Sequence, residues 1–206
     1  MPISLSVPRR LLALAAVAAG LAVVPAASAQ AAVIATGACD SSALTTPFAA
    51  WGDRSVYKLV PGGDFEGDLS GWSLSAGARR VAGSEPYSAT GRLGSSSLYL
   101  AAGATAQSPY TCVNAAYPTL RLFGRNAGLL SNVLVSVVYR NLLGGTLAIP
   151  VGTVSLSGSW QPTLPMATAS AVAGALNGGT AQVALRFTAI GGASQIDDVF
   201  IDPRCM

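Results

Sequence analysis

The sequence predicts an all-β sandwich or barrel, and three observations lead to this. Apolar and polar residues alternate in two long stretches, residues 133–139 and 183–189. Weaker alternation recurs in shorter stretches, at residues 97–101, 119–123, 147–151 and 153–156. Glycine pairs lie between such stretches, at residues 62–63, 144–145, 178–179 and 191–192. Alternation is typical of half-buried strands and paired glycine of turns, so many short strands are expected.

Only residues 167–176 have a composition suited to a helix, and the stretch is short and lacks capping residues. It is expected to be either a short helix or a long loop. The chain is 51% hydrophobic and 10% charged, which argues against disorder. We find no internal repeat or linker, so the sequence predicts a single domain.

The first segment has the pattern of a secretory signal. Arg9 and Arg10 precede an apolar run over residues 11–24, and residues 27–29 form an Ala-x-Ala tripeptide. The run is shorter than a membrane-spanning helix needs, so residues 1–29 are predicted to be a cleaved signal peptide. We therefore expect a secreted, extracellular protein.

The remaining chain is predicted to comprise two parts. Residues 30–57 are expected to be a leader that packs on the domain through Phe48 and Trp51, and residues 58–206 to be the β-sandwich domain. No second apolar run reaches spanning length, so no membrane span is expected after cleavage.

Charge and composition exclude several function classes. Loss of Arg9 and Arg10 with the signal lowers the twelve basic residues to ten, against nine acidic ones. The basic residues are scattered, so nucleic acid is not an expected partner. The chain has no histidine and no nucleophile elbow or phosphate-binding loop. We predict that it is not an enzyme.

Three cysteines, Cys39, Cys112 and Cys205, are expected to meet oxidising conditions outside the cell. We favour a disulfide between Cys39 and Cys112, because it would tie the leader to the sheet while Cys205 lies in the tail. Pairing of Cys205 with Cys39, or between two chains, stays open.

Both ends of the domain carry a motif. Residues 59–66, Leu-Val-Pro-Gly-Gly-Asp-Phe-Glu, precede Trp72, and residues 196–203 are Ile-Asp-Asp-Val-Phe-Ile-Asp-Pro. They resemble the opening motif and the last strand of galactose-binding-like jelly rolls, notably carbohydrate-binding modules of families 4, 9 and 22. The resemblance implies a jelly-roll β-sandwich with Trp72 in the core. A wider pattern, which includes Cys39 and Cys112, also looks like a family of short secreted actinobacterial proteins of unknown function.

The same resemblance implies a structural Ca²⁺, held by Glu66 with Asp197 or Asp198. Asp197 has the parity of Val199 and Ile201, which places its carboxylate on an apolar face. Such a carboxylate needs a cation or hydrogen bonds. The alternative is that both aspartates cap a turn or pair with an arginine such as Arg186.

Sugar binding needs exposed aromatic faces with polar groups beside them. The candidate ligand-binding residues are Trp51, Tyr87 and Trp160, and the polar loop is expected at residues 84–87 with Arg79, Arg80 and Arg92 nearby. The alternative is that each is a half-buried aromatic of the sandwich.

These observations predict a secreted, non-catalytic module that binds a polysaccharide or cell-wall glycan. The alternative is a structural or protein-interaction domain at the cell surface with no glycan ligand. The alternative is favoured by the small number of candidate aromatics and by the absence of room for an attached catalytic domain.

Overall fold

The structure is a computed structural model. It describes residues 42–75, 77–114, 119–128, 130–140, 145–168 and 180–202. The chain divides into two compact units, Met1–Gln30 and Ala31–Met206. The first unit, which contains the predicted signal peptide, lies outside the described residues. Within the described ranges, no helix is long and apolar enough to span a membrane.

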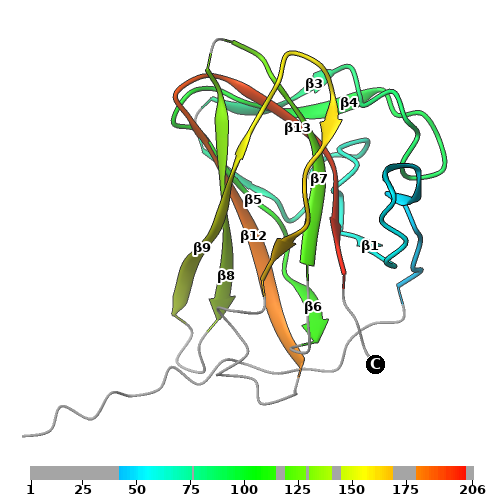
Figure 1. The fold of residues 1–206 in the computed structure, drawn as a ribbon. Coiled ribbons are helices and arrows are strands. Elements are labelled where there is room, and N and C mark those ends of the chain that lie inside the picture. The colour runs from blue at the N-terminus through cyan, green and yellow to red at the C-terminus, as the bar shows by residue number, and fades with distance from the viewer. Residues whose placement is uncertain are drawn as a thin grey trace, which may run out of the picture. The chain divides into compact units, whose positions relative to one another are not determined.

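Two antiparallel sheets form the second unit (Figure 1). The first, here the β7 sheet, has the order β10 (Gln161–Pro162), β7 (Thr119–Asn126), β13 (Ser194–Ile201), β4 (Ser96–Leu100), β3 (Ala78–Ala82), while β1 (Lys58–Leu59) pairs with β13 and β11 (Met166–Ala167) with β7. The second, here the β12 sheet, has the order β2 (Ser73–Leu74), β5 (Thr105–Gln107), β12 (Thr180–Ile190), β8 (Asn132–Arg140), β9 (Thr146–Ser155), and β6 (Thr111–Asn114) also pairs with β12. The predicted all-β jelly-roll sandwich is confirmed.

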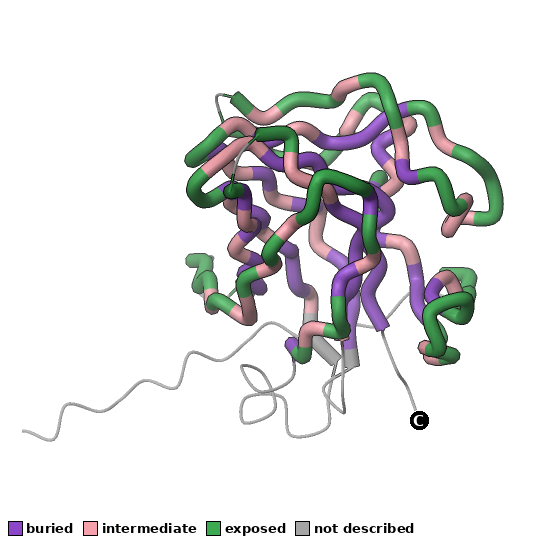
Figure 2. Tube along the Cα trace, turned by 45° about the horizontal axis from the view of Figure 1, so that its top comes forward, coloured by how far each residue is buried: buried purple, intermediate pink, exposed green. Residues whose placement is uncertain are grey.

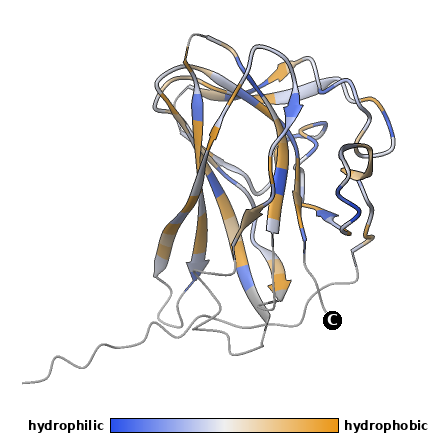
Figure 3. Ribbon diagram, in the orientation of Figure 1, coloured by the Kyte–Doolittle hydropathy of each residue, from blue (hydrophilic) through white to orange (hydrophobic). Residues whose placement is uncertain are grey.

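The apolar side chains of the alternating stretches fill the space between the two sheets. Val135 and Val137 of β8 and Leu185 and Phe187 of β12 are fully buried in one core cluster. That cluster also contains side chains of the facing sheet, Leu98, Leu100, Leu120, Leu122 and Ile196. Burial of each such side chain stabilises the fold by about 1.5–3 kcal/mol. Buried segments therefore run along the strands, where hydrophobic residues concentrate, and the loops are exposed (Figures 2 and 3).

Trp72 packs against this core, as predicted. Its ring lies edge-on to Phe65 at 5.0 Å and is stacked at 6.3 Å from Phe187. Its indole Nε1 donates a hydrogen bond to the carbonyl of Pro61 at 3.0 Å. Of the stretch expected to be a helix or loop, Ala167 ends strand β11, and residues 169–179 lie outside the described residues.

The described part of the predicted leader, residues 42–57, packs on a second cluster. The 3-10 helix Ala49–Trp51 follows Phe48, whose ring contacts Tyr57, Phe123 and Phe200. We call this second cluster the outer aromatic cluster; its buried members are Phe48, Tyr57, Phe123, Trp160 and Phe200. Because Phe123 and Phe200 belong to β7 and β13, the leader covers part of the outer face of the β7 sheet.

The opening motif requires glycine at residue 63. A Cβ atom there would lie 2.9 Å from the carbonyl oxygens of Val60 and Val199. The Val60 carbonyl accepts the Gly63 amide within the motif, and the Val199 carbonyl accepts the Val60 amide, which joins the motif to β13. We predict that Gly63→Ala lowers the free energy of unfolding by about 2 kcal/mol, because a backbone segment must shift.

Gly67→Ala is the matched control, since nothing lies within 4 Å of a Cβ at that position. Chemical denaturation of both variants measures the difference. Equal stability of the two variants would contradict the proposed close approach.

Candidate functional site

The candidate site is a surface hollow of about 510 Å³, here the aromatic groove. One wall comes from residues 45–51 of the leader and the other from the loop of residues 87–91. Its lining combines two aromatic rings with hydroxyl groups, from Thr45, Thr46, Trp51, Tyr87, Ser88 and Thr90. The fold thus joins two segments that are far apart in the sequence.

Two of the predicted ligand-binding residues lie side by side in this groove. Trp51 is 37% exposed and Tyr87 42% exposed, and their rings meet edge to face with centroids 5.0 Å apart. Both rings also contact Phe123, at 5.4 Å and 5.7 Å. The pair therefore has a buried support and an open side that faces solvent.

Trp160, the third predicted residue, has a different position. Its side chain is 7% exposed and belongs to the outer aromatic cluster. Its carbonyl oxygen accepts a hydrogen bond from the Tyr87 hydroxyl at 2.9 Å. The Trp160 backbone thus holds the Tyr87 hydroxyl, and the Trp160 ring itself exposes little surface to a ligand.

An ion pair holds the leader wall in place. Arg121 of β7 is 4% exposed, and its Nη1 donates to Oδ2 of Asp53 at 2.7 Å. The same carboxylate accepts hydrogen bonds from the Tyr57 hydroxyl at 2.7 Å and from the Ser55 backbone amide at 3.0 Å. The Arg121 guanidinium also lies 4.1 Å above the ring of Phe48. A buried cation is costly without a partner, so this arrangement fixes residues 48–57 against β7.

The pKa of Asp53 reflects these contacts. Partial burial alone would raise the pKa, but hydrogen bonds from Tyr57, Ser55 and Arg121 outweigh it and lower the pKa to about 2. Burial raises the pKa of the Tyr57 hydroxyl to about 12, so this group remains a donor to Asp53.

The loop wall depends on Glu85, which lies in the predicted polar loop of residues 84–87 but was not a predicted site residue. Glu85 is 1% exposed; its Oε1 accepts the amide of Ala89 at 2.9 Å and its Oε2 accepts the amide of Tyr87. These bonds hold a turn in which Ser88 has a positive φ of 58°. The available sequence signal was that Glu85 is one of only two glutamates and stands two residues before Tyr87.

Asp197 connects this loop to the sheet. Its Oδ2 accepts the Ser84 hydroxyl at 2.7 Å and the Glu85 amide at 2.9 Å, and its Oδ1 accepts the Asp198 amide at 2.9 Å. The prediction that a fully buried Asp197 needs hydrogen bonds or a cation is thus met by hydrogen bonds to the protein. The suggested partner Arg186 donates to Gln107 instead.

The predicted parity of Asp197 is wrong. Val199 and Ile201 belong to the core between the sheets, but so does Ile196, the immediate neighbour of Asp197. The register of β13 against β7 shifts between Asp197 and Phe200, and Asp198 has a positive φ of 46°. This bulge adds one residue to the strand, so Asp197 points to the outer face, towards Ser84 and Glu85 of the loop that leads into the second wall of the groove.

The residues predicted to bind Ca²⁺ are only partly brought together. The Glu66 carboxylate accepts three hydrogen bonds, from the amides of Ser95 and Ser96 and from the Ser95 hydroxyl. Asp198 instead shares a side-chain hydrogen bond with Glu85, and burial, then the charges of Asp197 and Glu85, raise the pKa of Asp198. Across the described ranges, no group of three or more acidic or cysteine side chains is placed to hold a metal ion.

Two of the arginines expected near the polar loop bind other groups of the protein. Arg92 lies 3.6 Å from Asp64, and Arg80 donates to the Gly67 carbonyl at 2.6 Å and to the Ser96 hydroxyl at 3.1 Å.

The predicted disulfide concerns Cys112, which is buried on β6. Cys39 and Cys205 lie outside the described residues, so the disulfide between Cys39 and Cys112 stays a prediction.

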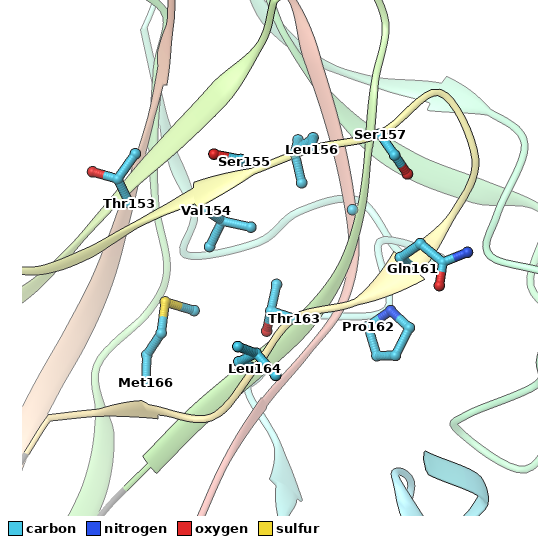
Figure 4. A pocket seen from close by; sticks show the side chains of 11 residues that line it. Thr153, Val154, Ser155, Leu156, Ser157, Gln161, Pro162, Thr163, Leu164 and Met166 are labelled. Carbon is cyan, nitrogen blue, oxygen red and sulfur yellow. The ribbon is translucent and has the colours of Figure 1, made fainter.

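A second hollow of about 400 Å³ lies between strand β9 and strands β10 and β11 (Figure 4). Its walls are largely aliphatic, with Val154, Leu156, Leu164 and Met166 (Figure 4). It contains none of the predicted site residues and no aromatic side chain, so it lacks the ring surface that sugar stacking needs.

No model of a known protein family matches the chain, and no curated protein matches it. Several solved structures are similar to it. One is the CBM22-1 xylan-binding domain from Paenibacillus barcinonensis Xyn10C, with 13% identity over 70% of this chain and 94% of that domain and a TM-score of 0.49. Another is the Clostridium thermocellum structure of the CBM22-1 and GH10 modules of endo-1,4-β-D-xylanase 10B with xylohexaose, with 16% identity over 69% of this chain and a TM-score of 0.48.

A third is TmCBM61 in complex with β-1,4-galactotriose, with 12% identity over 71% of this chain and 98% of that chain and a TM-score of 0.45. This chain spans only 28% of the length of the xylanase chain. The similar structures include modules of family 22, one of the families that the end motifs indicate. At these identities and TM-scores, the similarity assigns no ligand or binding residue to this chain.

The low pKa of Asp53 generates a prediction for acid stability. A carboxylate with a lowered pKa in the folded protein stabilises it fully above the unfolded value, about 3.9, and loses this effect as the pH falls towards the folded value. We expect Asp53→Asn to lower the free energy of unfolding by about 2 kcal/mol at pH 7, because the variant leaves the Arg121 charge buried without its partner.

This difference between wild type and Asp53→Asn should shrink below about pH 4, fall to a small fraction at pH 2, where the carboxyl group of the folded protein is half protonated, and vanish below pH 2. Chemical denaturation at several pH values measures it, with Asp68→Asn as a control at an exposed aspartate. A difference that stays constant down to pH 2 would show that the ion pair of Asp53 is not its source.

Proposed function

We propose that this protein is a secreted, non-catalytic module that binds a polysaccharide or cell-wall glycan in the aromatic groove. One observation carries the proposal: Trp51 and Tyr87 form a half-exposed edge-to-face pair between two walls that carry hydroxyl groups. An exposed aromatic ring provides an apolar face for a sugar ring, and nearby hydroxyl groups bind the sugar hydroxyls.

The groove is held in shape before any ligand binds. Phe123 supports both rings, the Asp53–Arg121 ion pair fixes the leader wall, and Glu85 fixes the loop wall. Ordering of side chains on binding costs about 0.5–1.5 kcal/mol for each flexible side chain. A groove built from two supported rings avoids much of this cost.

The carboxylates beside the groove support a non-catalytic role. A glycosidase needs one carboxyl group that protonates the leaving group and a second that acts on the sugar. Asp53 is engaged by Arg121 and has a pKa of about 2, while Glu85 is buried and accepts two backbone amides. Both carboxylates are thus engaged in the bonds that hold the two walls of the groove.

Secretion is supported by the signal-like pattern of residues 1–29. Export would also allow Cys112 to form the proposed disulfide with Cys39.

The proposal predicts a loss of glycan binding when either ring is removed. For a polysaccharide that the wild type retains, we expect Trp51→Ala and Tyr87→Ala each to weaken binding about tenfold, because each loses a stacking surface worth about 1.4 kcal/mol. Affinity electrophoresis against a panel of polysaccharides and cell-wall preparations measures the effect.

Tyr110→Ala is the matched control, because Tyr110 lies outside the groove, beneath the guanidinium of Arg140 at 4.1 Å. It should leave binding unchanged. A wild type that binds no polymer would favour a structural or protein-interaction domain. An equal loss in Tyr110→Ala would place the binding site elsewhere.

We also propose a structural Ca²⁺, with a changed set of carboxylates. Asp198 and Glu85 fit the chemistry of a hard cation, because they are buried, share a hydrogen bond and lie near the charges of Asp197 and Asp64. Glu66 is not among the carboxylates whose charges raise the pKa of Asp198, and its own carboxylate accepts three hydrogen bonds from Ser95 and Ser96. Backbone carbonyls and water would complete the shell of a two-carboxylate site.

Bound calcium should raise the melting temperature by about 5 °C relative to the protein in a chelator. The shift should disappear in Asp198→Asn and persist in Glu66→Gln, the matched control. Differential scanning fluorimetry with Ca²⁺, Mg²⁺ or chelator measures it. Identical melting in Ca²⁺ and chelator would show that hydrogen bonds alone satisfy these carboxyl groups.

A further inference from the structure

Four side chains form a continuous row across the outer face of the β7 sheet. Arg79 of β3 is paired in register with Tyr99 of β4, Tyr99 with Gln195 of β13, and Gln195 with Arg125 of β7. We call these four residues the arginine row. Neighbouring strands lie about 4.8 Å apart, so the row spans about 14 Å.

The alternation of each strand places the row on the outer face. Leu98 and Leu100 flank Tyr99 and belong to the core, and Ile196 of the core follows Gln195. On β7, Phe123 belongs to the outer aromatic cluster, so Arg125, two residues further, lies on the same face.

Both guanidinium groups of the row lie over aromatic rings. The Arg79 guanidinium is 4.3 Å from the centre of the Tyr99 ring, and that of Arg125 is 5.1 Å from the centre of Trp160. Arg125 Nε also donates a hydrogen bond to Oε1 of Gln195. A guanidinium held over a ring by a cation–π contact still has N–H groups that can bind a planar acceptor.

Among the residues that the structure describes, no carboxylate forms an ion pair with Arg79 or Arg125. Two other arginines are paired there, Arg92 with Asp64 and Arg121 with Asp53. The acidic residue nearest the row along β13, Asp197, is buried and accepts bonds from Ser84 and Glu85. The row therefore presents two positive charges, while Gln195 between them is buried and holds Arg125 in place.

The row adjoins the aromatic groove. Phe123 supports Trp51 and Tyr87, and Arg125 follows it by two residues on the same face of β7. Trp160 lies beneath Arg125, and its carbonyl accepts the Tyr87 hydroxyl. Arg125 is thus joined through Trp160 to Tyr87, a residue that lines the groove.

We propose that the arginine row binds carboxylate groups of an acidic polysaccharide, so that the ligand of this module is a glycan that contains uronic acids. The inference rests on the proposed glycan-binding function and specifies its substrate class. The two N–H groups of an arginine fork match the two oxygens of a carboxylate, and a charge-assisted pair is about twice as strong as a neutral hydrogen bond.

The test compares polygalacturonate with its fully methyl-esterified form, which has the same backbone without the charge. We expect the secreted protein to bind polygalacturonate at least about tenfold more tightly, by isothermal titration calorimetry. Arg125→Gln and Arg79→Gln should each reduce this affinity about tenfold and leave affinity for the ester unchanged.

Two further variants, Arg140→Gln and Arg125→Lys, distinguish binding by the arginine fork from attraction to positive charge. Arg140→Gln is the matched control, because Arg140 is stacked on Tyr110 away from the row and carries the same charge. It should change affinity by less than about twofold. Arg125→Lys keeps the charge and should lose most of the preference. Arg79 lies on the exposed edge strand β3. Arg79→Gln therefore tests the row even if Arg125→Gln does not fold.

Equal affinity for the two polymers would overturn this inference and leave the proposed function standing, provided that Trp51→Ala still weakens binding. A loss in Arg140→Gln as large as that in Arg125→Gln would also overturn it, because attraction to net charge would then explain the preference. Binding of neither polymer nor any neutral polysaccharide would overturn the proposed function as well.

Discussion

The ion pair between Asp53 and Arg121 is the interaction on which the candidate site depends. Arg121 is a buried cation on the outer face of a sheet, and without a partner it would be strongly destabilising. Asp53 comes from the leader, so satisfying the cation draws residues 48–57 onto β7. That contact packs Phe48 against Phe123 and holds Trp51 on Phe123 with 37% of its surface exposed.

A second carboxylate, Glu85, organises the opposite wall by accepting backbone amides. Asp197 then attaches this loop to β13 through Ser84 and the Glu85 amide. Two segments that are far apart in the sequence are thus fixed to one sheet by carboxylates, of which Asp53 is half-buried and Glu85 and Asp197 are buried, and the rings between them are supported by Phe123. Buried polar groups with complete hydrogen bonding give such loops a defined geometry.

Much of the fold could be predicted from the sequence, because the alternation of β8 and β12 directly reflects a sheet with one buried face. Trp51 and Tyr87 could be selected because aromatic residues outside the alternating strands are few. The position of Asp197 could not be predicted. One extra residue in a strand reverses the parity of the residues beyond it, and nothing in the sequence at Asp198 indicates the bulge. The arginine row depends on register between four strands, which a single sequence does not specify.

The central claim is that a glycan binds between the leader and the groove loop. Chemical-shift mapping of the isotopically labelled protein with a soluble oligosaccharide tests this without any substitution. The account predicts that the largest shifts fall on backbone amides of residues 45–51 and 87–91 and extend to Arg125. Shifts confined to the outer face of the β12 sheet, or none at saturating oligosaccharide, would contradict it.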